Sequence, residues 1–150
     1  MRAVLDTNIV IDLLRFADPS TLDLRRAIAR GAVLCFTDRD CLTELQRVSA
    51  YPQFQLDPAA RRALLDGYRR FVLDCDAADP EGTANPDDRV LPRCRDADDQ
   101  KFLILALRCR ADLLITRDRQ LLRLSGRRRP PLPCHIVTAT EASRLIQEPA

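Results

Sequence analysis

Two aspartates directly follow short apolar runs that are typical of β-strands. Asp6 comes after the run AVL and is followed by Thr7 and Asn8, and Asp118 comes after the run LLIT. In open parallel sheets, ligand-binding residues gather beyond the carboxyl ends of the strands, so these two carboxylates are candidates for one shared site. Each could instead cap the helix that follows it, a position that aspartate favours. Asn8 could orient the Asp6 carboxylate, and Thr116 could hold a carboxylate or a water molecule.

Glu44 is an acid on the apolar face of an expected helix. Cys41, Leu45 and Val48 recur around it at helical spacing, which places the carboxylate where a charge is costly. A buried carboxylate needs a partner, and the pattern leaves three interpretations open. Glu44 serves metal chemistry, forms a salt bridge with one of the many arginines, or lies on a helix rotated enough to expose it.

Three acids crowd the start of a strongly apolar helix in RCRDADDQKFLILALRCR. A helix dipole favours each such charge by roughly 0.3 to 1 kcal/mol, which accounts for one or two of them. Asp99 precedes Phe102 and Leu103 at i+3 and i+4, so it is predicted to point toward the sheet. Asp98 lies about 100° around the helix and is the weaker candidate.

Four carboxylates at one end of a sheet repel one another, and divalent cations offset that repulsion. Mg²⁺ and Mn²⁺ prefer oxygen ligands, and two such ions about 3.5 to 4 Å apart can activate water and stabilise the leaving oxygen of a phosphodiester. Zinc is disfavoured because the six cysteines include no C-x-x-C pair and His135 is the single histidine. The residue types therefore point to hydrolysis assisted by Mg²⁺ or Mn²⁺.

The elements that must position these acids alternate between short apolar runs and amphipathic stretches. This alternation predicts an α/β fold with a small, mostly parallel sheet covered by helices, and the length of 150 residues predicts one domain, 1–150. Strands are expected at 2–5, 32–36, 71–73, 112–116 and 135–137. Helices are expected at 9–15, 21–30, 39–50, 58–68, 98–110, 120–124 and 139–146, the last with a capping box at 138–141. The segments 77–95 and 126–133 are expected to be loops.

Composition sets limits on the class of partner. Of the 24 basic residues, all but Lys101 are arginine, a side chain that suits phosphate, although codon bias is the simpler explanation. The net charge of +2 permits a nucleic-acid partner without requiring one. No run approaches the ~18 apolar residues of a membrane span, and the N-terminus lacks a signal peptide. We expect a cytoplasmic protein with reduced cysteines and no membrane contact.

The segments LDTNIVIDLL, LTELQRV, RDADDQKFLILAL and ADLLITRDRQLL occur in this order over nearly the whole chain. Together they resemble the PIN domain, and most closely the toxin components of bacterial toxin-antitoxin pairs. The resemblance implies a three-layer fold with about five strands, Mg²⁺- or Mn²⁺-dependent cleavage of RNA, frequent dimerisation and an antitoxin partner. By motif position, Asp6, Glu44 and Asp99 correspond to the acidic triad and Asp118 to the fourth acid. Because Asp98 and Asp99 are adjacent, the third acid of the triad could be either of them, and Asp99 is the one that we favour.

On this hypothesis Asp6, Asp99 and Asp118 bind metal, while Glu44 completes the shell or positions the attacking water. Arg117, Arg119 and the run 127–129 are candidates to hold the RNA backbone, although a solvated loop is the simpler interpretation of the run. The competing hypothesis is a non-catalytic scaffold of the same fold that binds RNA or protein. The presence of every acid favours the enzyme.

Overall fold

A five-stranded sheet lies at the centre of the computed structural model, which describes residues 1–78, 90–126 and 131–148. The strand order is β3-β2-β1-β4-β5, and every adjacent pair is parallel. The strands are β1 Arg2–Leu5, β2 Leu34–Thr37, β3 Val72–Asp74, β4 Leu113–Ile115 and β5 His135–Val137. The predicted α/β class is confirmed, and the sheet is parallel throughout.

The strand order reverses direction between β1 and β4. From β1 the chain moves outward through β2 to β3, and then returns to the other side of β1 for β4 and β5. Leu5 pairs with Ile115, and the amide of Asp6 donates to the Ile115 carbonyl at 2.9 Å, so both strands end at the same level. Ligand sites in open α/β sheets form at such a reversal, beyond the carboxyl ends of the strands.

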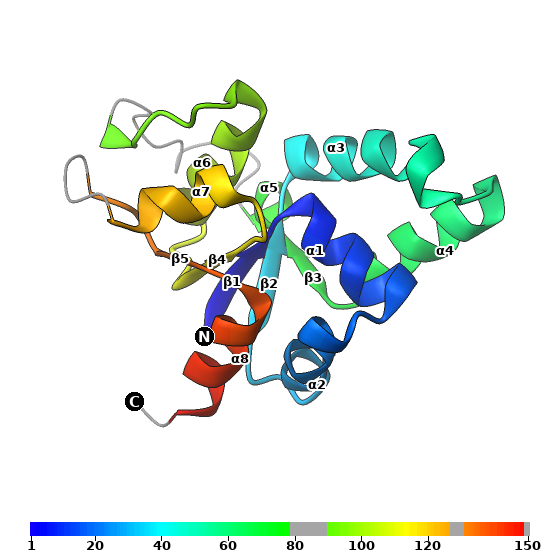
Figure 1. Cartoon of the computed structure of the whole chain (residues 1–150), viewed down its shortest axis with the longest axis horizontal. Helices are drawn as coiled ribbons and strands as arrows, with labels where there is room; N and C mark the ends of the chain where they lie inside the picture. The colour runs from blue at the N-terminus through cyan, green and yellow to red at the C-terminus, as the bar shows by residue number, and fades with distance from the viewer. Residues whose placement is uncertain (79–89, 127–130, 149–150) are drawn as a thin grey trace.

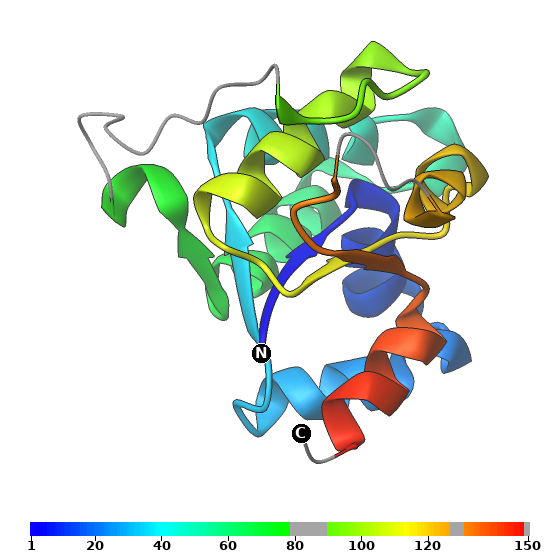
Figure 2. The ribbon, with the colours of Figure 1, turned by 90° about the vertical axis from the view of Figure 1, so that its left-hand side faces the viewer.

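Helices cover both faces of the sheet (Figures 1 and 2). Figure 2 shows α2 and α8 side by side beneath the sheet, with α6 above it. The helices are α1 Thr7–Ile11, α2 Leu22–Ala29, α3 Arg39–Ser49, α4 Pro58–Arg69, α5 Cys75–Ala78, α6 Gln100–Arg108, α7 Arg119–Arg123 and α8 Ala139–Gln147. Shorter turns are the π-turn η1 Asp12–Phe16 and the 3-10 turns η2 Pro19–Thr21, η3 Pro52–Phe54, η5 Ala97–Asp99 and η6 Leu124–Gly126. Within the described part of the chain, no helix is long and apolar enough to cross a membrane.

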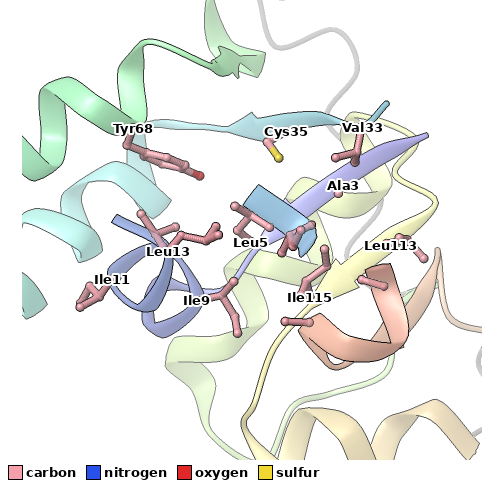
Figure 3. Packing of buried hydrophobic residues seen from close by; sticks show 14 of the residues in the cluster. Ala3, Leu5, Ile9, Ile11, Leu13, Val33, Cys35, Tyr68, Leu113 and Ile115 are labelled. Carbon is pink, nitrogen blue, oxygen red and sulfur yellow. The ribbon is translucent and has the colours of Figure 1, made fainter. Parts of the chain in front are cut away.

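Alternation along the strands divides the core into two layers. Ala3 and Leu5 of β1 point to one face, where they pack with side chains of α1, α2, α4 and α8 (Figure 3). Val4 points to the other face, where it packs with Phe102 of α6 and Leu121 of α7. Full burial of a large apolar side chain contributes roughly 1.5 to 3 kcal/mol, so these layers hold the carboxyl ends of β1 and β4 in place.

Some element boundaries differ from those predicted. The first helix begins at Thr7 and continues into η1, and the residue that follows η1, Ala17, lies in the left-handed region with a φ of 46°. The helix predicted at 98–110 begins at Gln100, because a 3-10 turn carries the preceding aspartates. Helix α5 was not predicted, since four residues are too few for a periodic signal. The capping box of α8 is present, with the amide of Thr138 donating to Glu141 at 2.8 Å. Of the predicted loops, residues 79–89 and 127–130 lie outside the described residues.

Candidate functional site

Asp6 lies at the N-cap of α1, yet its side chain makes no capping hydrogen bond. Its carboxylate is 5% exposed and accepts a hydrogen bond on Oδ2 from the Thr116 hydroxyl, at 2.7 Å. The same hydroxyl oxygen accepts from the backbone amide of Asp118, at 3.0 Å. Thr116 therefore joins the ends of β1 and β4 and holds the Asp6 carboxylate away from the helix that it precedes.

Asp99 also occupies an N-cap, that of α6, without capping it. The turn before α6 is capped by Asp96, which accepts from the amide of Asp98 at 2.9 Å. Asp98 is exposed and Asp99 is half-buried, as the helical geometry predicted. No hydrogen bond between described residues reaches the Asp99 carboxylate.

Asp118 is a genuine helix cap. Its Oδ1 accepts from the amides of Gln120, at 2.7 Å, and Leu121, at 3.3 Å, so the capping alternative is the one observed. Its Oδ2 accepts no hydrogen bond from the described residues. The carboxylate thus keeps one oxygen available while it fixes the start of α7.

Glu44 is buried on α3, and each of its carboxylate oxygens accepts one hydrogen bond. Lys101 Nζ lies 2.7 Å from Oε1, and the Thr7 hydroxyl donates to Oε2. Arg47 lies farther away, at 3.9 Å from Oε1. The salt-bridge interpretation of Glu44 is therefore the one that the structure shows, with a lysine as the main partner in place of the predicted arginine.

The four acids act on one another electrostatically. Burial raises the pKa of Asp6 to about 6, with further contributions from the charges of Glu44 and Asp118, despite the opposing hydrogen bond from Thr116. Burial also raises the pKa of Asp99 to about 7, and the charges of Asp6 and Asp118 add to the effect. Side chains more than a hundred residues apart in sequence thus converge on one region, where the neighbouring charges disfavour the ionised forms of Asp6 and Asp99.

A comparison with known protein families shows which family has this arrangement of acids and strands. The model of the PIN domain family matches residues 2–120, a stretch that contains all four acids and strands β1 to β4. The chain belongs to the PIN domain family. PIN domains are typically nucleases and typically depend on a metal ion.

The fold of this PIN domain has a counterpart among solved structures. It is similar to a chain in the crystal structure of VapBC2 from Rickettsia felis bound to a DNA fragment from their promoter. The match covers 92% of this chain and 98% of the other, with a TM-score of 0.56 and 16% sequence identity. At this identity the similarity shows a shared fold. No curated protein matches the chain.

The acids of this PIN domain suit a magnesium or manganese ion in chemistry but do not form a closed cage. Among the described residues, no group of three acidic, histidine or cysteine side chains could hold a metal ion. Mg²⁺ is usually bound through only one or two carboxylates, with water and substrate phosphate completing its coordination. Asp6 and Asp99 are desolvated acids that repel each other, a strain that a divalent cation would relieve. We conclude that the donor set fits such an ion together with water.

Three other predicted site residues lie elsewhere or make different contacts. The Asn8 side chain makes no hydrogen bond to Asp6 within the described chain, so its predicted orienting contact is absent. Arg117 pairs with Asp12 of η1, with Nε 3.0 Å from Oδ2, while its side chain stays largely exposed. Arg119 is exposed and forms no ion pair with a described residue. The run 127–129 lies outside the described residues.

Two residues at the site were not predicted, Lys101 and Thr7. Lys101 is the single lysine of the chain and lies two residues after Asp99, a departure from the arginine bias that could have drawn attention to it. Thr7 adjoins Asp6, but nothing local indicates that its hydroxyl reaches α3. Both contacts depend on how α1, α3 and α6 pack together.

Proposed function

We propose that this PIN domain is a metal-dependent endoribonuclease. The observation that carries the proposal is the behaviour of Asp6 and Asp99: Asp6 occupies a helix N-cap without capping, and the Asp99 carboxylate accepts no hydrogen bond from a described residue. Asp6 forgoes a capping hydrogen bond worth about 1 kcal/mol, and both acids are placed in a desolvated cluster with Asp118 and Glu44. A purely structural role does not offset the cost of desolvating acids that repel one another, whereas binding a divalent cation does.

Each residue of the cluster has a distinct task in this proposal. Asp6, Asp99 and the available oxygen of Asp118 would hold Mg²⁺ or Mn²⁺, and Thr116 keeps Asp6 oriented toward it. When bound, such an ion lowers the pKa of water and stabilises charge on the phosphodiester. Glu44, held between Lys101 and Thr7, positions the attacking water.

Incubation of the purified protein with end-labelled single-stranded RNA tests the proposal. We expect internal cleavage with Mn²⁺ and none with EDTA. An Asp6→Asn variant purified in the same way should lose the activity, because an amide cannot replace a charged oxygen ligand. RNA binding without cleavage at any metal concentration would favour the non-catalytic scaffold, and equal cleavage by the variant would indicate a contaminating nuclease. A DNA strand of the same sequence establishes whether the sugar matters.

We further propose that the protein acts as a toxin neutralised by an antitoxin. The support is the sequence resemblance to toxin components, together with a surface suited to a protein partner. A groove of about 640 Å³ between η1, α2 and α4 has apolar walls that include Leu14, Ala63 and Phe71. Arg15 and Arg25 also line it, as does Arg70. We expect the antitoxin to fill this groove with apolar side chains flanked by acidic ones.

Expression in a bacterial host tests the toxin role. We expect growth arrest that disappears when Asp6 and Asp99 are both replaced by asparagine and that is relieved by a small protein encoded beside this one. An Ala63→Arg variant should still arrest growth but escape relief, because it places a charge and extra volume in the groove. Ala50→Arg, at the exposed C-cap of α3 and outside the lining of the groove, should remain neutralised. Arrest that persists in the double aspartate variant would contradict a nuclease toxin.

A further inference from the structure

A hollow lined by arginines adjoins the acidic cluster. It has a volume of about 370 Å³, and its lining residues are Arg93, Arg95, Gln120, Arg123 and Leu124. They come from two parts of the chain, the segment that leads into η5 and the stretch formed by α7 and the start of η6, which lie close together in Figure 1. No acidic residue is part of this lining.

Both walls of the hollow lead directly into the acidic cluster. Arg95 lies one residue before Asp96 and four before Asp99, and Gln120 lies two residues after Asp118, to which its amide donates. The hollow is therefore within a few residues of two of the four acids, one on each side. A strand whose phosphodiester is at the acids would pass its neighbouring phosphates close to these arginines.

Two arginines of the hollow have no acidic partner among the described residues, unlike several arginines elsewhere in the molecule. Arg26 and Arg117 pair with acids, and Arg108 is held between Asp38 and Asp76. By contrast, no ion pair between described residues engages Arg95 or Arg123. Two like charges that share one concavity without a counter-charge are unfavourable, and a bound anion relieves that cost.

A nuclease with this acidic cluster needs a positively charged surface nearby to bind RNA. Several carboxylates at one sheet edge repel a polyanion, so affinity for RNA must come from positive charge nearby. Guanidinium groups suit this task, because their planar forks donate two parallel hydrogen bonds to phosphate oxygens. The amide of the Gln120 side chain adds a neutral donor to the same hollow.

We propose that this hollow binds the backbone phosphates of the RNA strand beside the bond to be cut, with Arg95 and Arg123 as the main contacts. This inference rests on the proposed ribonuclease function and adds where the substrate lies. It places the main phosphate contacts at residues other than Arg117, whose guanidinium group pairs with Asp12.

Binding measured without metal separates this inference from the cleavage reaction. We would titrate a labelled single-stranded RNA with the full chain in EDTA, following fluorescence anisotropy at several salt concentrations. The double variant Arg95→Gln/Arg123→Gln should bind about tenfold more weakly at moderate salt. Its plot of log affinity against log salt should be shallower by about 1.4, because each lost phosphate contact on a single strand removes about 0.7 from the slope.

The matched control is Arg62→Gln/Arg69→Gln on α4, at the opposite side of the molecule in Figure 1, which removes the same net charge. It should leave affinity and salt slope close to those of the unmodified protein. An equal loss in both double variants would overturn the proposal in favour of general charge attraction. Tighter binding of polyglutamate than of RNA at the hollow would overturn it in favour of an acidic protein partner. Melting temperatures of both variants exclude unfolding. If the protein cleaves no RNA with Mn²⁺, the ribonuclease proposal is contradicted. The binding measured in EDTA still shows whether Arg95 and Arg123 contact RNA.

Discussion

Replacing Asp99 with asparagine is expected to lower the rate of Mn²⁺-dependent RNA cleavage by about a thousandfold or more, the scale seen when a catalytic group is removed. The substitution keeps the size of the side chain but removes the charge that a divalent cation requires. The effect should fall on the rate at saturating metal as well as on the affinity for metal. Quenched cleavage time courses across a Mn²⁺ titration measure both.

Asp98→Asn is the matched control for this experiment. Asp98 is one residue away, carries the same charge and is exposed, so its replacement should change the rate by no more than about twofold. The stability of the metal-free protein is a second measurement on these variants. Asp99→Asn removes a desolvated acid and should leave the metal-free protein at least as stable as before. A larger loss of activity in Asp98→Asn than in Asp99→Asn would show that the assignment is displaced by one residue.

The metal-free protein is expected to become less stable as the pH rises from about 4 to about 7. The folded pKa of Asp6 is about 6 and that of Asp99 about 7, both above the ordinary value of 3.8. Between these limits the folded state binds more protons than the unfolded state, so unfolding releases protons and is favoured by higher pH. Asp6 alone, being almost fully buried, should contribute a loss of roughly 2 kcal/mol, whereas the more exposed Asp99 adds less than its pKa suggests. Urea unfolding in EDTA at pH 5 and pH 8 measures the difference.

Mn²⁺ should restore the stability that is lost at high pH. A ligand that binds only the folded state adds about 2.7 kcal/mol at a concentration one hundred times its Kd. The gain should be large at pH 8, where both acids are ionised, and small at pH 5. The double variant Asp6→Asn/Asp99→Asn should show neither the pH dependence nor the Mn²⁺ effect. A double variant that keeps the full pH dependence would assign it to other groups.

The geometry of the site explains why these effects should concentrate on two of its acids. Asp118 is stabilised as a cap by two backbone amides, and Glu44 is neutralised by Lys101. Asp6 has one hydroxyl donor from the Thr116 side chain, and Asp99 accepts no hydrogen bond from a described residue. The uncompensated charge therefore lies mainly between the ends of β1 and α6, which is where a cation would be held most tightly.

The order of strands and helices could be predicted from the sequence because it depends on local periodicity. Short apolar runs such as AVL and LLIT are typical of buried strands, and the amphipathic segments between them favour a parallel sheet. That reasoning placed Asp6 and Asp118 at strand ends and turned Asp99 inward, and the structure has them there. The boundaries near Asp12 and Ala97 were less accurate, since π and 3-10 turns leave no distinct periodic pattern.

Only the tertiary structure decided which partner each charged side chain has. The sequence placed Glu44 on the apolar face of its helix but left its exposure and its partner open, because the helix rotation that brings Lys101 to it depends on the packing of α3 against α6. Whether an aspartate caps its helix likewise depends on competing contacts. Asp118 accepts a hydrogen bond from an amide of its helix, whereas Asp6 accepts one from the Thr116 hydroxyl. The arginine hollow has the same origin, because it joins residues 93–95 to residues 120–124 across the fold. Local patterns determine burial and element type, whereas pairing between distant side chains follows from how whole elements pack.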